Sequence, residues 1–308
     1  MTRDAKSTAI RKRSVPGQRP RVSPALIAGL AHRLTGRDRA LLDLLWEHRV
    51  LTTEQLSAIF YPSISKARHR LLDLYRLAVL ERFQPWTPVG TRPLHWVLGP
   101  AGAHVLAAQR GIAVRELGYR LDAVLSISHS PKLAHQVGVN DFFARLHAHA
   151  RRPDALSALT QWWPERRCTA LWGDLARPDA FGCWRTVRPD GSPAEVDFFL
   201  EHDTGSEPLA RVAGKLTGYA ALAESTGIST PVLFWLPSQA REANLREVIG
   251  TPEVPVATAA RTPAAHPDGP AGPVWLPAGP TGARRTLAAL ADIWPATGPH
   301  TPPGAGTD

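Results

Sequence analysis

The spacing of apolar side chains predicts a run of helices and two strands in the first part of the chain. Leucines recur every three or four residues, as they do on one side of an amphipathic helix. Thr35 stands just before the first run, with Asp38 three residues later, a pattern typical of a helix start. Helices are expected over 35–48, 52–60, 63–77 and from Gly99 to Gln109, and strands over 79–84 and 94–98 with the loop 85–93 between them.

The third of these helices has a basic outer side. Three short helices of this kind, followed by two strands and a loop, resemble the winged-helix DNA-binding fold. The resemblance implies that the third helix enters the major groove and that the loop is the wing, with Arg82 or Arg92 on the DNA backbone or in the minor groove. A winged helix used for protein contacts is the alternative. The candidate DNA-binding residues are Ser65, Lys66, His69, Arg70, Arg82 and Arg92.

From residue 132 the pattern changes to a long helix followed by strands that alternate with helices. A turn is expected at Arg188–Gly191, where Pro, Asp and Gly follow one another. A β-hairpin followed by a βαβαβ order predicts a mixed sheet with helices on both faces. The helices are expected over 132–150, after Ser206 and over 239–249, and the strands over 156–163, 180–184, 195–201, 232–236 and 254–258.

The candidate chemistry lies in the stretch 195–219. Its apolar strand ends in Glu201 and Asp203, which should share a face because side chains alternate along a strand. Lys215 and Tyr219 are four residues apart and should share a face of the following helix. Two carboxylates at a strand end and a lysine on the next helix can hold a divalent metal and a phosphate. An ordinary solvated strand end and a surface helix are the alternative.

Pro178 and Asp179 start one strand, and Glu201 and Asp203 end the next, an order that resembles the PD-(D/E)xK nuclease fold. The resemblance implies that these acids hold Mg²⁺ or Mn²⁺, which offset the charge that builds up on a phosphodiester during attack. The third position of the motif is Asp203 rather than lysine, and Lys215 could supply the amine instead. The candidate catalytic residues are Asp179, Glu201, Asp203 and Lys215, and the candidate metal ligands are Asp179, Glu201, Asp203 and Glu165.

Over residues 34–294 the chain also resembles the replication-relaxation family of actinobacterial and Bacillus-type plasmids and integrative elements. The resemblance rests on four segments, LTTEQLSAIFYPSISKARHRLLDLYRLAVL, HQVGVNDFF, RPDAFGCW and FFLEHDTGSEPLARVAGKLTGY. It implies action on mobile-element DNA during replication or transfer. Two functions remain open at this point. One is a metal-dependent DNA-nicking or relaxing enzyme, and the other is a non-catalytic winged-helix regulator of replication or transcription with a degenerate nuclease-fold domain.

Most of the net charge lies at the N-terminus. Of the formal +9, residues 1–22 contribute +6, from seven Lys and Arg side chains and one acid, Asp4. A basic tail of this kind is expected to be disordered and to contact DNA phosphates without reading sequence. A tail that only keeps the protein in solution is the alternative.

Composition excludes several other classes of protein. No apolar run approaches the about 20 residues of a membrane span, so no membrane partner is expected. Cys168 and Cys183 are too few for a disulfide framework or a zinc site, and a cytoplasmic setting follows. Double-stranded DNA is the expected partner, and a homodimer is left open.

The chain is predicted to be of the α+β or α/β class and to have four parts. These are a basic disordered tail at 1–33, a winged-helix domain at 34–125, a PD-(D/E)xK-like mixed sheet flanked by helices at 126–260, and a segment rich in Pro, Gly and Ala with a short helix at 261–308.

Overall fold

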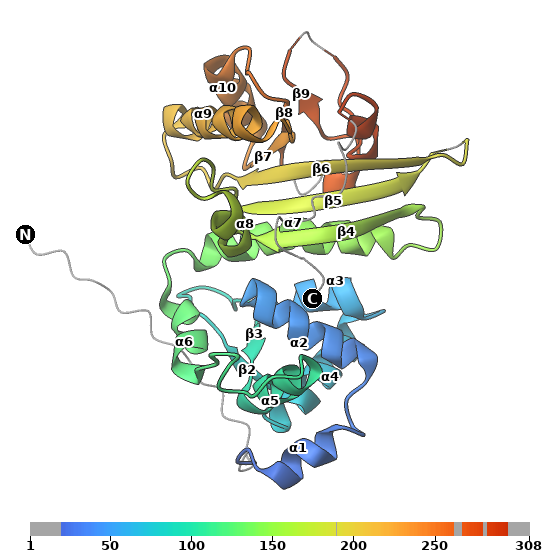
Figure 1. Cartoon of the computed structure of the whole chain (residues 1–308), viewed down its shortest axis with the longest axis vertical. Coiled ribbons are helices and arrows are strands. Elements are labelled where there is room, and N and C mark those ends of the chain that lie inside the picture. Colours follow the sequence, from blue (N-terminus) through green and yellow to red (C-terminus); the bar gives the residue numbers. More distant parts are fainter. Residues whose placement is uncertain (1–19, 189, 262–266, 280–281, 295–308) are drawn as a thin grey trace, which may run out of the picture. The chain divides into compact units, whose positions relative to one another are not determined.

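Figure 1 shows the computed structural model, which describes residues 20–188, 190–261, 267–279 and 282–294. The chain forms two compact units, Met1–Ala144 and Arg145–Asp308. Helix α7 (Leu133–Ala150) spans this division, whereas the sequence placed the change of domain between residues 125 and 126. Residues 1–19 of the predicted tail lie outside the described residues, as do 262–266, 280–281 and 295–308 of the predicted C-terminal segment and Pro189 in the predicted turn.

The first unit combines helices with a small antiparallel sheet. Its three strands are ordered β1-β3-β2, so the two predicted strands pair and a short third one joins them. The predicted helices are confirmed. The elements are α1 (Pro24–Leu30), α2 (Gly36–His48), β1 (Leu51–Thr52), α3 (Thr53–Phe60), α4 (Ile64–Arg76), β2 (Leu80–Phe83), β3 (His95–Leu98), α5 (Pro100–Gln109), α6 (Leu121–Leu125) and η1 (Ser126–His129).

Local side-chain bonds explain where these helices start. Thr35 and Thr52 each form a capping box, in which the threonine hydroxyl and the side chain three residues later satisfy backbone N–H groups of the first turn. Ser63 caps α4 through its hydroxyl alone, which accepts a hydrogen bond from the N–H of Lys66 at 3.4 Å. Ser23 caps α1, so residues 24–30 form a helix, although the sequence placed them in the disordered tail.

The second unit contains a mixed sheet, as predicted, but the sheet has six strands where five were expected, because the short β9 joins its edge. Its order is β4-β5-β6-β7-β8-β9; β6, β7 and β8 are parallel and the other pairs are antiparallel. The elements after α7 are β4 (Ser157–Pro164), α8 (Glu165–Trp172), β5 (Ala180–Val187), β6 (Pro193–His202), α9 (Leu209–Thr226), β7 (Val232–Leu236), α10 (Gln239–Ile249), β8 (Val256–Ala260), η2 (Gly269–Ala271), β9 (Leu276–Pro277) and η3 (Ala288–Asp292).

Three details differ from the predictions. Helix α8 lies between the expected strands 156–163 and 180–184, where no helix was predicted. Helix α9 has Pro208 at its N-cap and starts at Leu209, so the interpretation of Ser206 as the residue that begins this helix is wrong. The helix expected near the end of the chain is a 3-10 helix, η3.

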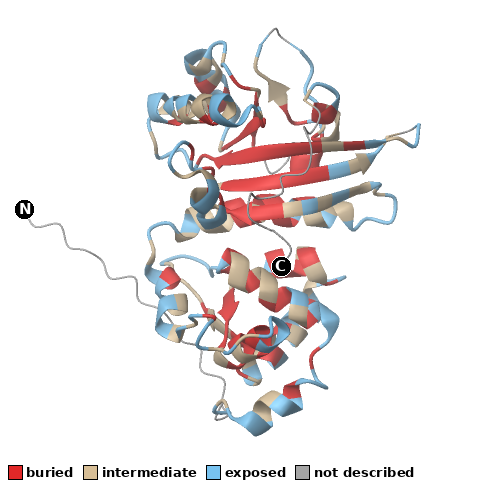
Figure 2. Ribbon diagram, viewed as in Figure 1, coloured by how far each residue is buried: buried red, intermediate tan, exposed pale blue. Residues whose placement is uncertain are grey.

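The central strands of the sheet are buried, as the red strands of Figure 2 show. One apolar cluster joins Phe181, Phe199 and Phe234 of the sheet to Tyr219 of α9 and Leu245 of α10, which places these two helices on the same face. On the opposite face, the rings of His147 and His149 contact those of Trp162 and Trp184, which lie on β4 and β5. Among the described helices, none has the length and apolar composition that a membrane span requires.

Candidate functional site

The pairing of β5 with β6 brings Asp179 next to Glu201. Ala180 pairs with Leu200 and Phe181 with Phe199, so Asp179 and Glu201 are the next facing positions along the two strands. The backbone N–H of Asp179 bonds to Leu200 O at 3.1 Å, and the Asp179 carboxylate accepts from the N–H of His202 at 2.7 Å. Since side chains alternate along a strand, both carboxyl groups lie on the face that carries Phe181 and Phe199.

Helix α9 supplies two side chains to Glu201. The Lys215 ammonium lies 2.6 Å from Glu201 Oε2, and the Tyr219 hydroxyl donates to Oε1 at 2.5 Å. The prediction that Lys215 and Tyr219 share a helix face is therefore confirmed. Glu201 is 2% exposed, whereas the Lys215 side chain is 35% exposed. The ion pair therefore has one partner, Lys215, partly exposed to solvent and the other, Glu201, shielded from it.

Burial and the nearby Asp179 determine the charge states of Glu201, Lys215 and Tyr219. Burial and the charge of Asp179 raise the pKa of Glu201 to about 7, against the lowering effect of Lys215 and Tyr219. Burial opposes the charge of Lys215, but Glu201 and Asp179 raise its pKa above the ordinary value, so it stays a cation. Burial also raises the pKa of Tyr219, which stays a neutral hydrogen-bond donor. The site thus contains a fixed cation beside a carboxyl group that titrates near neutral pH.

Asp203 is held by a different helix. The Arg241 guanidinium at the start of α10 forms an ion pair with the Asp203 carboxylate and donates to Glu207 O at 2.6 Å. The N–H of Gly205 adds a bond to Asp203 Oδ1 at 2.7 Å. Asp203 therefore fixes the loop between β6 and α9, with its charge balanced by an arginine that the sequence interpretation did not single out.

The four predicted metal ligands do not all gather in one place. Within the part of the chain that the structure describes, Asp179, Glu201, Asp203 and Glu165 provide no group of three ligand atoms within 4.8 Å of one another. Glu165 is the first residue of α8 and is half-buried. Asp179 and Glu201 are left as the pair that could hold a divalent cation, with Asp203 committed to Arg241.

A glycine sets how closely α9 approaches this site. A Cβ atom at Gly218 would lie 2.3 Å from the carbonyl oxygen of Leu175, which is closer than such contacts allow. Gly218 lies one residue before Tyr219, and Leu175 lies four residues before Asp179. The absence of a side chain at Gly218 therefore lets α9 pack directly on the segment that leads to Asp179.

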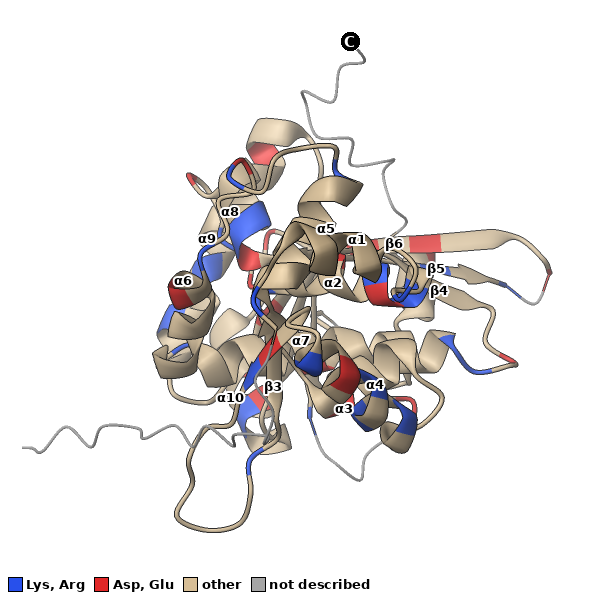
Figure 3. Ribbon diagram, turned by 90° about the horizontal axis from the view of Figure 1, so that it is seen from below, with Lys and Arg blue, Asp and Glu red and all other residues tan. Residues whose placement is uncertain are grey.

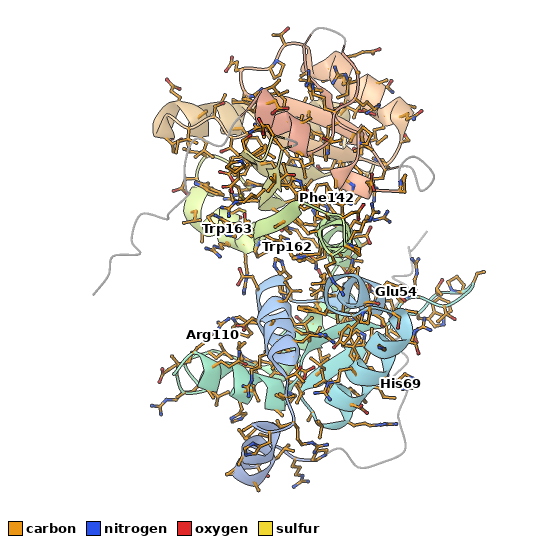
Figure 4. The ribbon with its side chains drawn as sticks, turned by 90° about the vertical axis from the view of Figure 1, so that its right-hand side faces the viewer. Glu54, His69, Arg110, Phe142, Trp162 and Trp163 are labelled. Carbon is orange, nitrogen blue, oxygen red and sulfur yellow. The ribbon has the colours of Figure 1, made fainter. Side chains whose placement is uncertain are left out.

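In the first unit, α4 presents a basic outer side. Ser65, Lys66 and His69 are exposed, as predicted, and Figure 4 labels His69 on this helix. Arg68 is exposed as well and was missed, although it belongs to the same polar side. Figure 3 shows Lys and Arg on α4, and also on α8 and α9 of the second unit.

Arg70 does not lie free on this outer side, which corrects the sequence interpretation. Its guanidinium forms an ion pair with Asp38 at 2.6 Å and donates to Arg33 O at 2.9 Å. Asp38 is 1% exposed and belongs to the capping box of α2. Burial tends to raise the pKa of Asp38, but the bonds from Arg70 and Thr35 lower it below the ordinary value. Arg70 therefore joins α4 to the start of α2.

Arg82 and Arg92, the two arginines proposed to contact DNA from the strands and the loop, have different surroundings. Arg82 on β2 lies over the rings of Tyr75 and Trp96, at 4.4 and 5.6 Å from their centroids, so much of its side chain is used in packing. Arg92 is exposed in the loop between β2 and β3. The Gln84 side chain, which donates to Arg92 O at 2.5 Å, closes the base of that loop.

Comparison with known proteins gives one match. No curated protein and no solved structure matches the chain. The model of the replication-relaxation family matches residues 42–233, more than half of the 308 residues. The matched range includes α4 of the first unit and the Glu201 and Lys215 of the second. The chain belongs to the replication-relaxation family.

Proposed function

We propose that this protein binds double-stranded DNA of a plasmid or integrative element, and that its second unit nicks that DNA with the help of Mg²⁺ or Mn²⁺. The observation that carries the proposal is that Asp179, just before β5, Glu201 of β6 and Lys215 of α9 converge at one edge of the sheet. Membership of the replication-relaxation family supports a role in the replication or transfer of mobile elements.

The first unit is proposed to act as a winged helix. Helices α2, α3 and α4 are followed by the antiparallel pair β2 and β3, with the loop that holds Arg92 between them. Helix α4 carries Lys66, Arg68 and His69 on its exposed side, where they could reach phosphates or base edges in a major groove. The exposed side of α4 is therefore the surface proposed to read DNA.

The second unit is proposed to have a PD-(D/E)xK-like nuclease fold. The fit of a metal rests on two acids, Asp179 and Glu201, at facing positions of the sheet. Burial and then the charge of Asp179 raise the pKa of Glu201, and a divalent cation would remove the repulsion between the two carboxylates. Oxygen ligands of this kind suit Mg²⁺ or Mn²⁺. When bound, such an ion supplies Lewis acidity to a phosphoryl oxygen. Lys215 contributes a fixed positive charge beside the phosphate, and Tyr219 orients the Glu201 carboxyl group.

The alternative is a DNA-binding regulator with an inactive second unit. It is favoured by the fact that both oxygens of Glu201 already accept hydrogen bonds from Lys215 and Tyr219. The ion pair of Asp203 with Arg241 likewise removes one acid from the predicted ligand set. In this case the buried ion pair stabilises the fold, and the basic side of α4 performs the function alone.

A plasmid assay separates the two functions. Supercoiled plasmid with the element's origin is incubated with the full chain and with Mg²⁺, Mn²⁺ or a chelator, and thermal melts are recorded with the same ions. The wild type should give relaxed plasmid and a metal-dependent rise in Tm. The Asp179→Asn variant should show neither relaxed plasmid nor the rise in Tm, but it should still retard DNA in a gel. The Lys215→Ala variant should keep the rise in Tm but nick the plasmid more slowly. A wild type with neither relaxed plasmid nor a metal-dependent rise in Tm would establish the regulator instead.

A further inference from the structure

A second group of polar side chains lies on the β5–β6 hairpin, on the same face as Glu201 but nearer the turn. Cys183 on β5 pairs with Asp197 on β6, and Glu195 lies two residues before Asp197, so the three side chains share a face. One ligand atom from each lies within 4.8 Å of the other two. Cys183 is 1% exposed and Asp197 is 7% exposed. A buried thiol, a buried carboxyl group and the half-buried carboxyl group of Glu195 are thus held together.

Strand β4 adds a fourth polar side chain. Gln161 pairs with Cys183 on the other side of β5, so its side chain projects to the same face. Gln161 Oε1 is buried and accepts no hydrogen bond within the described part of the chain. A buried amide oxygen without a donor is costly, and such atoms are rare in native proteins. This oxygen therefore has capacity for a ligand on the face of the sheet that carries the thiol and the carboxyl groups.

This group is distinct from the candidate nicking site. Cys183 lies four residues after Asp179, which directly precedes β5, and Asp197 lies four residues before Glu201 on β6. At about 3.3 Å per residue the two groups are roughly 13 Å apart along the strands. The proposed DNA chemistry uses none of the residues of this second group.

We propose that Cys183, Glu195 and Asp197 bind a transition-metal dication of the zinc class, with Gln161 Oε1 as the fourth ligand. This departs from the expectation that two cysteines are too few for a zinc site, because carboxyl and amide oxygens supply the remaining ligands. One sulfur and three oxygen atoms from three adjacent strands suit a borderline metal, whereas Mg²⁺ prefers ligands that are all oxygen. Upon binding, the Cys183 thiol gives its proton to solvent and a sulfur–metal bond forms. The ion joins β4, β5 and β6, and so stabilises the hairpin that ends in Glu201.

The charge of the site is compatible with such an ion. Arg185 Nε donates to Glu195 Oε2 at 2.6 Å, which leaves Oε1 of the same carboxylate for the metal. A thiolate and two carboxylates carry three negative charges, and a dication together with Arg185 balances them. Arg185 is more than half exposed, so it can adjust when the ion enters.

Cobalt provides the test because a Co²⁺–thiolate bond absorbs in the near ultraviolet. Metal-stripped full-length protein is titrated with Co²⁺ and then with Zn²⁺. The wild type should develop the charge-transfer band with one equivalent of Co²⁺ and lose it to Zn²⁺ but not to excess Mg²⁺. Cys183→Ser should abolish the band. Cys168→Ser is the matched control, since Cys168 is the other buried cysteine, and it should leave the band unchanged.

Two further variants guard against a failure to fold and against confusion with the nicking site. Glu195→Gln changes a half-buried residue and should weaken Co²⁺ binding at least tenfold while the circular dichroism spectrum is preserved. Glu201→Gln should leave the band unchanged, so the result does not depend on the proposed nicking activity. No band in the wild type, a band that survives in Cys183→Ser, or unchanged Co²⁺ affinity in Glu195→Gln would overturn the proposal.

Discussion

At the scale of single residues, Glu201 combines structure and candidate chemistry. The carboxyl group is buried, and an ammonium and a phenol each bond to one of its oxygens. A buried carboxylate is costly unless a cation or hydrogen bonds compensate for lost water. Lys215 and Tyr219 provide that compensation, but Asp179 opposes it, so the group keeps its proton up to near neutral pH.

This balance predicts how stability depends on pH. Because the folded state raises the pKa of Glu201 from 4.5 to about 7, the neutral carboxyl stabilises the fold at low pH. That contribution is fully present below the unfolded pKa and is lost as the pH rises through about 7. Relative to Glu201→Gln, the wild type should lose roughly 3 kcal/mol of unfolding free energy over this window. Urea unfolding of both proteins from about pH 4 to pH 8 measures the difference, and parallel curves would contradict it.

The close packing at Gly218 predicts that a single added methyl group will destabilise the fold. Gly218→Ala places a methyl group against Leu175 O and should destabilise the fold by about 1–3 kcal/mol, because overpacking forces the helix outward. The same shift moves Lys215 and Tyr219, so any nicking should fall with it. Gly214→Ala is the matched control on the same helix, since nothing lies within 4 Å of its Cβ position. It should be neutral or stabilising by up to about 1 kcal/mol. Equal effects of the two changes would show that the close packing is unimportant.

At the scale of elements, the basic residues of α4 have two roles, packing within the first unit and proposed DNA binding. Its inner side buries Ala67, Leu71 and Leu74, and Arg70 at the edge binds Asp38 of α2. Only the remaining outer side is available to DNA. The orientation of α4 relative to α2 is therefore fixed by an ion pair that uses one of the predicted DNA contacts.

Arg70→Ala is expected to act on stability before it acts on DNA. It leaves the buried Asp38 without its cation and should cost about 2 kcal/mol, less than for a fully buried pair because the Arg70 side chain is 30% exposed. Lys66→Ala together with Arg68→Ala is the contrasting variant. It should keep the wild-type Tm and weaken DNA binding, by about 1–3 kcal/mol for each lost base contact. Thermal melts and gel shifts at fixed salt distinguish the two, and an unchanged Tm in Arg70→Ala would contradict the structural role.

At the scale of the whole molecule, charge is unevenly distributed. Most of the net +9 lies in residues 1–22, of which 1–19 are outside the described residues. Deletion of residues 1–22 should lower affinity for all DNA sequences alike and reduce the slope of log K against log salt, because fewer counterions are released. Binding titrations over a range of salt concentrations measure the slope. An identical slope for the full-length and shortened proteins would show that the tail does not contact DNA.

The sequence by itself determined the features that depend on neighbouring residues. The helix starts at Thr35 and Thr52 depend on bonds three residues away, and the shared face of Lys215 and Tyr219 depends on the helical period. The strand order near Glu201 followed from the alternation of strands and helices. Helix α8 was missed because its eight residues make little more than two turns, which is too few to establish a periodic pattern.

Tertiary structure alone decided which distant residues meet. Arg70 with Asp38 and Arg241 with Asp203 are separated by 32 and 38 residues, and no local spacing relates them. The meeting of Gln161, Cys183 and Asp197 likewise depends on which strands pair and in which register. Hydrogen-bonded strands and packed helices bring such residues within contact distance only after the chain has folded. A periodic pattern therefore predicts which face a side chain occupies, and the fold decides which partner it finds there.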